Sequence, residues 1–495
     1  MWIWPRTDPF KASSFDELHY FGNGVFGYHC IKELKTRLKE YPAEGRDFKT
    51  LLDRGIMNVP RWPTLHHFEK GFTNISFTDG SKYDDLAKVM VHACHDVFPK
   101  DLCPREYTLM RLIRNYTICK NLGGLQVHTE QSLDELEKAI LAFGDILEDY
   151  EQYAESDIKP KDWNVIKIHI QKHIRRDVEL KGSLLSMSTK HSEKFHGPMR
   201  KNYLARTNFK NVMEQLAKWD HRFFVSEVIR ENIEAWDKMI KEEEDRIAAQ
   251  KKEDLPEGAG KHRPRARDLN QWEQIYLGAP DPVTTYGAFE HWHKDDVAYE
   301  RFRIKLNNFL KVFLNDHANL EGSEWKDEPD DYRYTTKLSS KDELIPCRFL
   351  EVEYESFGTW ETSQDKLRCN PDFHKKGERY DSVLFRETED TFTFARLICI
   401  FICKTDGHRL PMALVQPYDG AIATSDGRRP VDWDFQFHRV KLAERSDSRV
   451  IPLRAVERGA LLTEDPDHED EYLVVDTVDT DMFLRIRKMH PEHFI

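Results

Sequence analysis

Two residues near the start of the chain have types and spacing that could do acid–base chemistry. Asp16 and His19 stand three positions apart, so a helix would put both on one face, where a carboxylate can orient an imidazole. The segment Gly24–His29, which contains two glycines and a second histidine, follows a few residues later. Asp-x-x-His is also a common helix cap, and this alternative is the simpler interpretation of the pair.

Two further clusters combine histidines with charged residues. Trp163–His173 places His169 and His173 four positions apart, a spacing that zinc can use, but no glutamate stands between them, which favours a structural role. Ser188–Asn208 contains Glu193 and His196, which share a face if the segment is helical. A basic run follows them and could meet phosphates.

Charge is distributed unevenly along the chain. The net charge of −13 argues against a generic nucleic-acid-binding protein, yet residues 161–222 hold 14 Lys or Arg against 6 Asp or Glu. Residues 461–495, in contrast, hold 3 Lys or Arg against 10 Asp or Glu. The basic stretch is either a solvated face or a surface for phosphates. In the second case the candidate DNA contacts are Lys172, Arg175, Arg176, Arg200, Lys201 and Arg206.

Other chemistry is not indicated. The sequence has no glycine-rich phosphate loop, no Gly-x-Ser-x-Gly and no Cys-x-x-Cys. Cys399 and Cys403 lie on one face of an expected strand and are best interpreted as buried, inert thiols. The eight cysteines are scattered, which is typical of a reducing compartment, so we expect a nuclear or cytoplasmic protein. The longest apolar run, 397–403, is too short to span a bilayer, and no membrane partner or secretory signal is expected.

The elements that position these residues change character along the chain. Residues 1–245 have mainly helical patterns. Ser132 and Glu135 form an expected capping box, followed by one apolar helix face: Leu133, Leu136, Ile140, Phe143, Leu147 and Tyr150. A long helix is expected from Phe209, with a core-facing stripe of Val212, Leu216, Trp219, Phe223, Ile229, Ile233, Trp236 and Ile240.

A linker and a β-rich part follow. Residues 255–267 contain Pro and Gly and read as a basic linker, and residues 297–315 are expected to be helical. From about residue 345, short β-branched runs alternate with turns, which predicts a small barrel or sandwich. The expected fold class is therefore α+β, with a helical region 1–245, a charged linker with helices 246–344 and a β-rich domain 345–495.

The order of these clusters resembles that in Plavaka-type transposases, a CACTA-type group of DNA transposases in basidiomycete fungi. The family's Pro-Asp-Leu-Leu-His and Lys-Gly-x-Phe-x-x-His are similar to Phe15–His29. Phe68–Tyr83 is similar to the next segment, with Thr78 in place of Trp. The Asn-x-Pro-Lys-x-His-x-x-x-His and Thr-Glu-x-x-Glu-Arg-x-His segments resemble Asn164–His173 and Thr189–Asn208. The β-rich tail, from Tyr380 to Ile486, also resembles the family's C-terminal part.

The resemblance implies an RNase H-like fold in which three carboxylates hold two Mg²⁺ ions for displacement at phosphorus. It nominates Glu193 as catalytic residue and metal ligand, with Asp16, His19 and His196 as further catalytic candidates. The first two acids of the family lie upstream of the Asp-x-x-His segment, and only fifteen residues precede Asp16 here. Lys190 stands where the family's first glutamate is expected. We therefore expect an incomplete site, with no cofactor for the chain alone and Mg²⁺ only if a complete site is assembled.

These expectations lead to one leading hypothesis and two alternatives. The leading hypothesis is a transposon-derived protein that binds DNA, such as transposon ends, but is catalytically incomplete. The first alternative is an active cut-and-paste transposase whose N-terminal part is missing from this sequence. The second is a non-catalytic interaction protein whose β-rich domain is a binding module.

Overall fold

Helices build the N-terminal half of the chain, as the sequence predicted. The computed structural model describes residues 12–41, 47–73, 75, 80–154, 160–253, 271–272, 274–317, 337–373, 377–388, 390–405, 408–422 and 428–491. Two compact units are present: unit 1 comprises residues 1–187 and 270–495, and unit 2 comprises residues 188–269. No helix among the described residues is long and apolar enough to cross a membrane.

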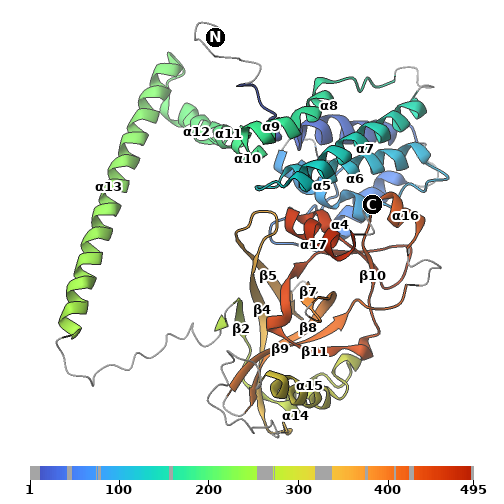
Figure 1. Cartoon of the computed structure of the whole chain (residues 1–495), viewed down its shortest axis with the longest axis vertical. Coiled ribbons are helices and arrows are strands. Elements are labelled where there is room, and N and C mark those ends of the chain that lie inside the picture. Colours follow the sequence, from blue (N-terminus) through green and yellow to red (C-terminus); the bar gives the residue numbers. More distant parts are fainter. Residues whose placement is uncertain are drawn as a thin grey trace. The chain divides into compact units, whose positions relative to one another are not determined.

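The N-terminal part of unit 1 contains helices of very different lengths (Figure 1). They are α2 (Glu17–Tyr20), the π-helix η1 (Asn23–Ile31), α3 (Lys32–Arg37), α4 (Phe48–Asn58), α5 (Gly80–Cys94), α6 (Pro104–Gly123), α7 (Glu130–Ala154), α8 (Ile166–Ile170), η2 (Gln171–His173), α9 (Ile174–Lys181) and α10 (Leu184–Met187). Helix α6 is buried along almost its whole length, so it forms the centre of this layer.

The sequence predicted the buried face of helix α7 correctly but misplaced its N-terminal cap. The expected apolar face is buried from Leu133 to Tyr150, which confirms that prediction. The cap prediction is wrong by one turn, because α7 begins at Glu130. The backbone N–H of Thr129 donates to the Ser132 hydroxyl at 2.9 Å, and the N–H of Ser132 donates to the Thr129 hydroxyl at 3.2 Å. Thr129 is thus the cap, and Ser132 completes a reciprocal box with it.

A curled antiparallel sheet forms the C-terminal part of unit 1, so the fold class is α+β (Figure 1). Its strands begin at residue 271, earlier than the expected 345. The eleven described strands are β1 (Gln271–Trp272), β2 (Ile275–Pro280), β3 (Thr284–Thr285), β4 (Glu343–Glu355), β5 (Thr362–Asn370), β6 (Arg379–Tyr380), β7 (Ser382–Arg386), β8 (Phe392–Thr405), β9 (His408–Pro417), β11 (Arg449–Pro452) and β12 (Val456–Ala460). The path of the sheet runs β1-β2-β4-β8-β7-β12, with β9 paired to β8 and β11 to β9.

Strand β8 divides the hydrophobic core into two parts. Leu397, Ile400 and Ile402 belong to the larger core, which the sheet shares with the N-terminal helices. Cys399, Phe401 and Cys403 belong to a smaller core under α14 (Tyr286–Trp292) and α15 (Phe302–His317), beside the short helix η4 (Val297–Tyr299). Successive side chains of a strand point to opposite faces, and the irregular pairing between 397 and 399 shifts this alternation by one residue.

The thiols in this strand are inert, as expected. Burial raises the pKa of Cys399 to about 12 and that of Cys403 to about 11. All eight cysteines are free and buried.

Ion pairs of buried arginines connect the C-terminal end of the chain to the helical layer and to the large sheet of unit 1. The second, three-stranded sheet has the order β10 (Arg439–Lys441), β14 (Glu471–Val474) and β13 (Leu462–Glu464). The remaining elements are α16 (Pro430–Asp434), η6 (Arg445–Asp447), η7 (Leu453–Ala455), η8 (Asp476–Val478) and α17 (Thr480–Met489). Arg114 of α6 binds Asp476 of η8, and Arg458 of β12, which is fully buried, binds Asp479 and Asp481 at 2.7 Å each.

Unit 2 consists of α11 (Lys190–Glu193), α12 (His196–Arg206) and the 42-residue helix α13 (Val212–Glu253). The long helix was expected, and so was its period. The prediction that its aromatic residues are core is wrong, because Phe223 is 63% and Trp236 60% exposed. Helix α12 packs on the first turns of α13, where Val212, Leu216 and Trp219 are half-buried. The expected linker 255–267 lies outside the described residues.

Candidate anion-binding pocket

A basic pocket lies between η1, α3 and the segment that leads into α8, all within unit 1. Its volume is about 530 Å³. It is lined by Tyr28, His29, Lys32, Glu33, Thr36, Arg37, Lys161, Asp162 and Lys167. The fold therefore joins two of the clusters that stood out in the sequence, the Gly24–His29 run and the start of the Trp163–His173 run.

The π-helix η1 gives one wall of the pocket its shape. Its wide turns are seen in a hydrogen bond from the Gly27 N–H to the Gly22 carbonyl at 2.9 Å, five residues earlier. Such helices are rare and are found frequently at functional sites. Gly24 is required here because a Cβ at this position would lie 2.3 Å from the carbonyl oxygen of His19. Glycine thus permits α2 and η1 to approach closely.

Lys161 is held inside the pocket by a carbonyl oxygen and an aromatic ring, and the nearby Glu33 carboxylate favours its charged form without forming an ion pair with it. Its Nζ donates to the carbonyl oxygen of His29 at 2.6 Å and lies 3.8 Å from the centre of the Trp163 ring. Burial lowers the pKa of Lys161 to about 8, so near pH 7 the ammonium is still mainly protonated. The carbonyl and the ring face are both favourable partners for a cation, but neither carries a full negative charge.

His29 is neutral at physiological pH. Burial, followed by the charges of Lys161, Lys167 and Lys32, lowers the pKa of its imidazole to about 4. Its buried Nδ1 has no hydrogen-bond partner among the described residues. In the neutral ring one nitrogen donates and the other accepts, so His29 can supply a neutral hydrogen bond to a bound group.

Glu33 and the lysines of the pocket differ in whether they already form ion pairs with neighbouring residues. Glu33 is already engaged, since it pairs with Arg37 at 3.2 Å and accepts a hydrogen bond from the Tyr150 hydroxyl at 2.6 Å. Within the described residues, no carboxylate forms an ion pair with Lys32, Lys161 or Lys167. With Lys32, Arg37, Lys161 and Lys167 against Glu33 and Asp162, the lining of the cavity has an excess of positive charge, which favours an anion.

The basic surface continues beyond this pocket. A neighbouring cavity of about 330 Å³ shares Tyr28, Lys32 and Thr36 with it and adds Lys35 of α3 and Lys39, which lies in the turn after α3. The Lys35 ammonium donates to the carbonyl of Ile75 at 2.9 Å, and burial lowers its pKa. The two cavities together present lysines over an area larger than one small ion requires.

The expected catalytic residues fall in different units. Asp16 caps α2 by accepting from the Leu18 N–H at 3.3 Å, and its other oxygen is hydrogen-bonded to His19 Nδ1. This pair is therefore the helix cap that the simpler interpretation proposed. Glu193 and His196 belong to α11 and α12 of unit 2. Asp16 and His19 therefore belong to unit 1, and Glu193 and His196 belong to unit 2.

The expected DNA contacts also differ from one another. Arg175 is bound by carboxylates of α7 and of its own helix: Glu130, Asp134, Glu137 and Glu179. It joins α9 to α7 and is poorly placed to meet a phosphate. Lys172 and Arg176 of unit 1 are exposed, and so are Arg200 and Lys201 of unit 2. Arg206 is exposed and stacks on the Trp219 ring at 4.4 Å.

The histidines of the second cluster contact each other. His169 and His173 are exposed, and their ring centres are 5.4 Å apart in an edge-to-face arrangement. They belong to none of the groups of possible metal ligands among the described residues.

One cluster of potential metal ligands does occur among the described residues, at Asp465, His468 and Glu471. Its carboxylates are already satisfied by arginines. Arg429 binds both oxygens of Glu471, and buried Arg439 binds Asp465 and Glu471. Burial alone would raise the pKa of Asp465, but hydrogen bonds from His95 and Arg439 outweigh it and hold that pKa far below its usual range. The cluster is best explained as a structural ion-pair network.

Comparisons with known proteins add no further assignment. No family model matches this sequence, and neither the curated proteins nor the solved structures include a match. The basic stretch 161–222 includes Lys161 and Lys167, but neither these two lysines nor Lys32 stood out individually in the sequence. The available signal was the spacing of Lys32, Lys35 and Lys39 at three and four residues, which places them along one helix face.

Proposed function

We propose that this chain binds nucleic acid through phosphate contacts and does not cleave it by itself, as a transposase-derived DNA-binding protein. The observation that carries the proposal is the pocket around the neutral His29, in which Lys32, Lys161 and Lys167 form no ion pair with any described carboxylate. Phosphate oxygens accept from ammonium groups, and such contacts supply most of the affinity in binding that is independent of sequence.

The transposase origin rests on the order of the sequence motifs, and the catalytic deficiency rests on the chemistry of the acids. A lone carboxylate does not hold Mg²⁺ usefully, and Asp16 is engaged as a cap with His19. Lys190 would place a cation beside any metal bound at Glu193. Exposed Lys172, Arg176, Arg200, Lys201 and Arg206 extend the proposed DNA contacts beyond the pocket.

The test is the salt dependence of duplex DNA binding by the full chain. Each phosphate contact contributes about 0.9 to the slope of log K against log salt concentration. The double variant Lys32→Gln with Lys167→Gln is expected to lower that slope by about 2. Lys404→Gln is the matched control, because Lys404 is paired with Glu343 at 3.0 Å on the sheet, and it should leave the slope unchanged. Binding that does not depend on salt, or an equal slope in both variants, would contradict the proposal.

A second measurement addresses catalysis. Supercoiled plasmid incubated with the full chain and Mg²⁺ is expected to remain intact. Cleavage that Glu193→Gln abolishes would instead establish an active nuclease site and overturn the non-catalytic part of the proposal.

A further inference from the structure

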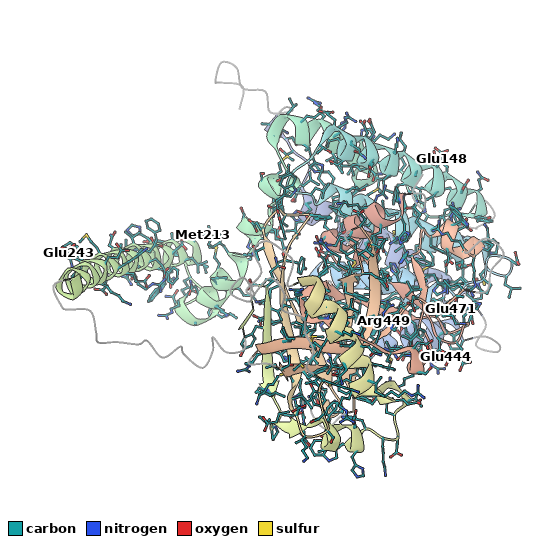
Figure 2. All side chains as sticks on the ribbon, turned by 60° about the horizontal axis from the view of Figure 1, so that its bottom comes forward. Glu148, Met213, Glu243, Glu444, Arg449 and Glu471 are labelled. Carbon is teal, nitrogen blue, oxygen red and sulfur yellow. The ribbon has the colours of Figure 1, made fainter. Side chains whose placement is uncertain are left out.

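The second half of α13 carries a continuous apolar stripe. At about 100° per residue, seven side chains between positions 225 and 240 fall within about 140° of the helix circumference. They are Val225, Val228, Ile229, Ile233, Trp236, Met239 and Ile240, and each is between 38% and 60% exposed. Figure 2 shows side chains projecting from α13 between Met213, near its start, and Glu243. Water is an unfavourable surrounding for a stripe of this size.

The opposite face of the same segment is polar and internally paired. Arg230 binds Glu227 at 2.5 Å and Glu234 at 3.7 Å, and Lys238 lies 3.9 Å from Glu242. The segment therefore has one face suited to water and one suited to a partner. The stripe is about 22 Å long at 1.5 Å per residue, which is enough for several layers of packed side chains.

Charge along unit 2 indicates which partner fits. Residues 188–211 carry six Lys or Arg against one Glu, and α13 adds Lys218 and Arg222 before the stripe begins. Directly after the stripe come four consecutive acids, Glu242–Asp245. A second copy in antiparallel orientation places the basic end of each helix beside the acidic end of the other. Parallel pairing would juxtapose like charges at both ends.

We propose that the 225–240 stripe of α13 is a self-association surface that forms an antiparallel helix pair between two copies of this chain. The pair is centred near Asn232 and Ile233, the midpoint of the stripe. The stripe itself contains none of the proposed DNA contacts, and two copies would double the number of basic surfaces available to one DNA molecule.

The first test is the mass of the full chain in solution by sedimentation velocity and light scattering. We expect twice the monomer mass of 58.6 kDa at micromolar concentration. Ile229→Glu with Trp236→Glu should give a monomer that retains its helical circular dichroism. Phe223→Glu is the matched control, because Phe223 is equally exposed but lies on the opposite side of the helix, and it should leave the dimer intact. A wild-type monomer at every concentration, or a dimer unaffected by the double variant, overturns the proposal.

The second test fixes the orientation and does not depend on variants that disrupt packing. The native cysteines are all buried, so an introduced surface thiol is the main oxidisable group. Asn232→Cys, at the centre, should form an intermolecular disulfide on mild oxidation. Met239→Cys should not, because its two copies would lie about 20 Å apart in the antiparallel pair. Efficient cross-linking of Met239→Cys, with or without that of Asn232→Cys, would show a parallel pair and overturn the proposal.

Discussion

Replacing Arg114 with methionine should destabilise unit 1 strongly. Arg114 lies on α6 and is 2% exposed, and its guanidinium makes four hydrogen bonds to the C-terminal part of the chain. Two reach the carboxylate of Asp476 at 2.8 and 2.7 Å, and the others reach the carbonyls of Phe435 and Gln436 at 2.7 and 2.9 Å. Methionine fills a similar volume but supplies none of these donors.

The magnitude follows from what the substitution leaves behind. Asp476 is 1% exposed and would keep only His92, whose Nε2 is 3.0 Å from its carboxylate. Burial by itself would raise the pKa of Asp476, yet Arg114 and His92 together hold that pKa well below its usual range, so the group is charged in the native protein. Removing one partner of a buried pair costs about 3–5 kcal/mol, because an uncompensated charge remains.

The assay is urea unfolding followed by far-UV circular dichroism and tryptophan fluorescence. Arg114→Met should lower the free energy of unfolding by about 4 kcal/mol. In combination with Asp476→Asn, the loss should be smaller than the sum of the two single losses by about 1–3 kcal/mol.

Arg61→Met is the matched control, because Arg61 forms an ion pair with Glu69 on the surface, and it should cost less than about 1 kcal/mol. A cost below 1 kcal/mol for Arg114→Met, or strict additivity in the double variant, would refute the conclusion that this pair joins the helical layer to the sheet.

Two further predictions concern the loss of stability at acidic pH and the effect of glycine substitutions on stability. Burial, with the charge of Arg114 as a further lowering cause, lowers the pKa of His92 from its ordinary 6.5 to about 4. Its contribution to stability is therefore fully present above pH 6.5 and is lost as the pH falls to about 4. Urea unfolding at pH 7 and 4.5 should show a loss of about 2 kcal/mol from this group, which His92→Gln should not show. Gly24→Ala should destabilise the protein by about 1–3 kcal/mol and weaken DNA binding, because the new Cβ would collide with the His19 carbonyl. Gly144→Ala in α7 should stabilise it by up to about 1 kcal/mol, because no atom lies within 4 Å of the new Cβ. Thermal unfolding that shifts in the same direction for both variants would contradict this prediction.

Local patterns predicted the fold class and several individual elements correctly. The apolar period of α7 and the β-branched run of β8 specify a helix face and a buried strand, because each pattern matches the geometry of one element. The errors occurred where one local pattern fits two environments. The pattern of the α13 stripe is typical of a core face, and only the exposed fractions of its side chains in the structure show that it is accessible to solvent. Ser132 has the right neighbours for a cap, but Thr129 begins the helix one turn earlier.

The sequence by itself determined the helical and β-rich halves, the long amphipathic helix and the uneven charge, since these depend on residue types and short-range periods. Tertiary structure alone decided the pocket. Lys32 and Lys161 are far apart in the chain and meet only because η1 packs beside the segment before α8. It also placed Asp16 and Glu193 in different units. It engaged Arg175 in ion pairs that connect α9 to α7. Which charges remain available to a ligand depends on which ones the fold has already paired, and spacing along the chain does not contain that information.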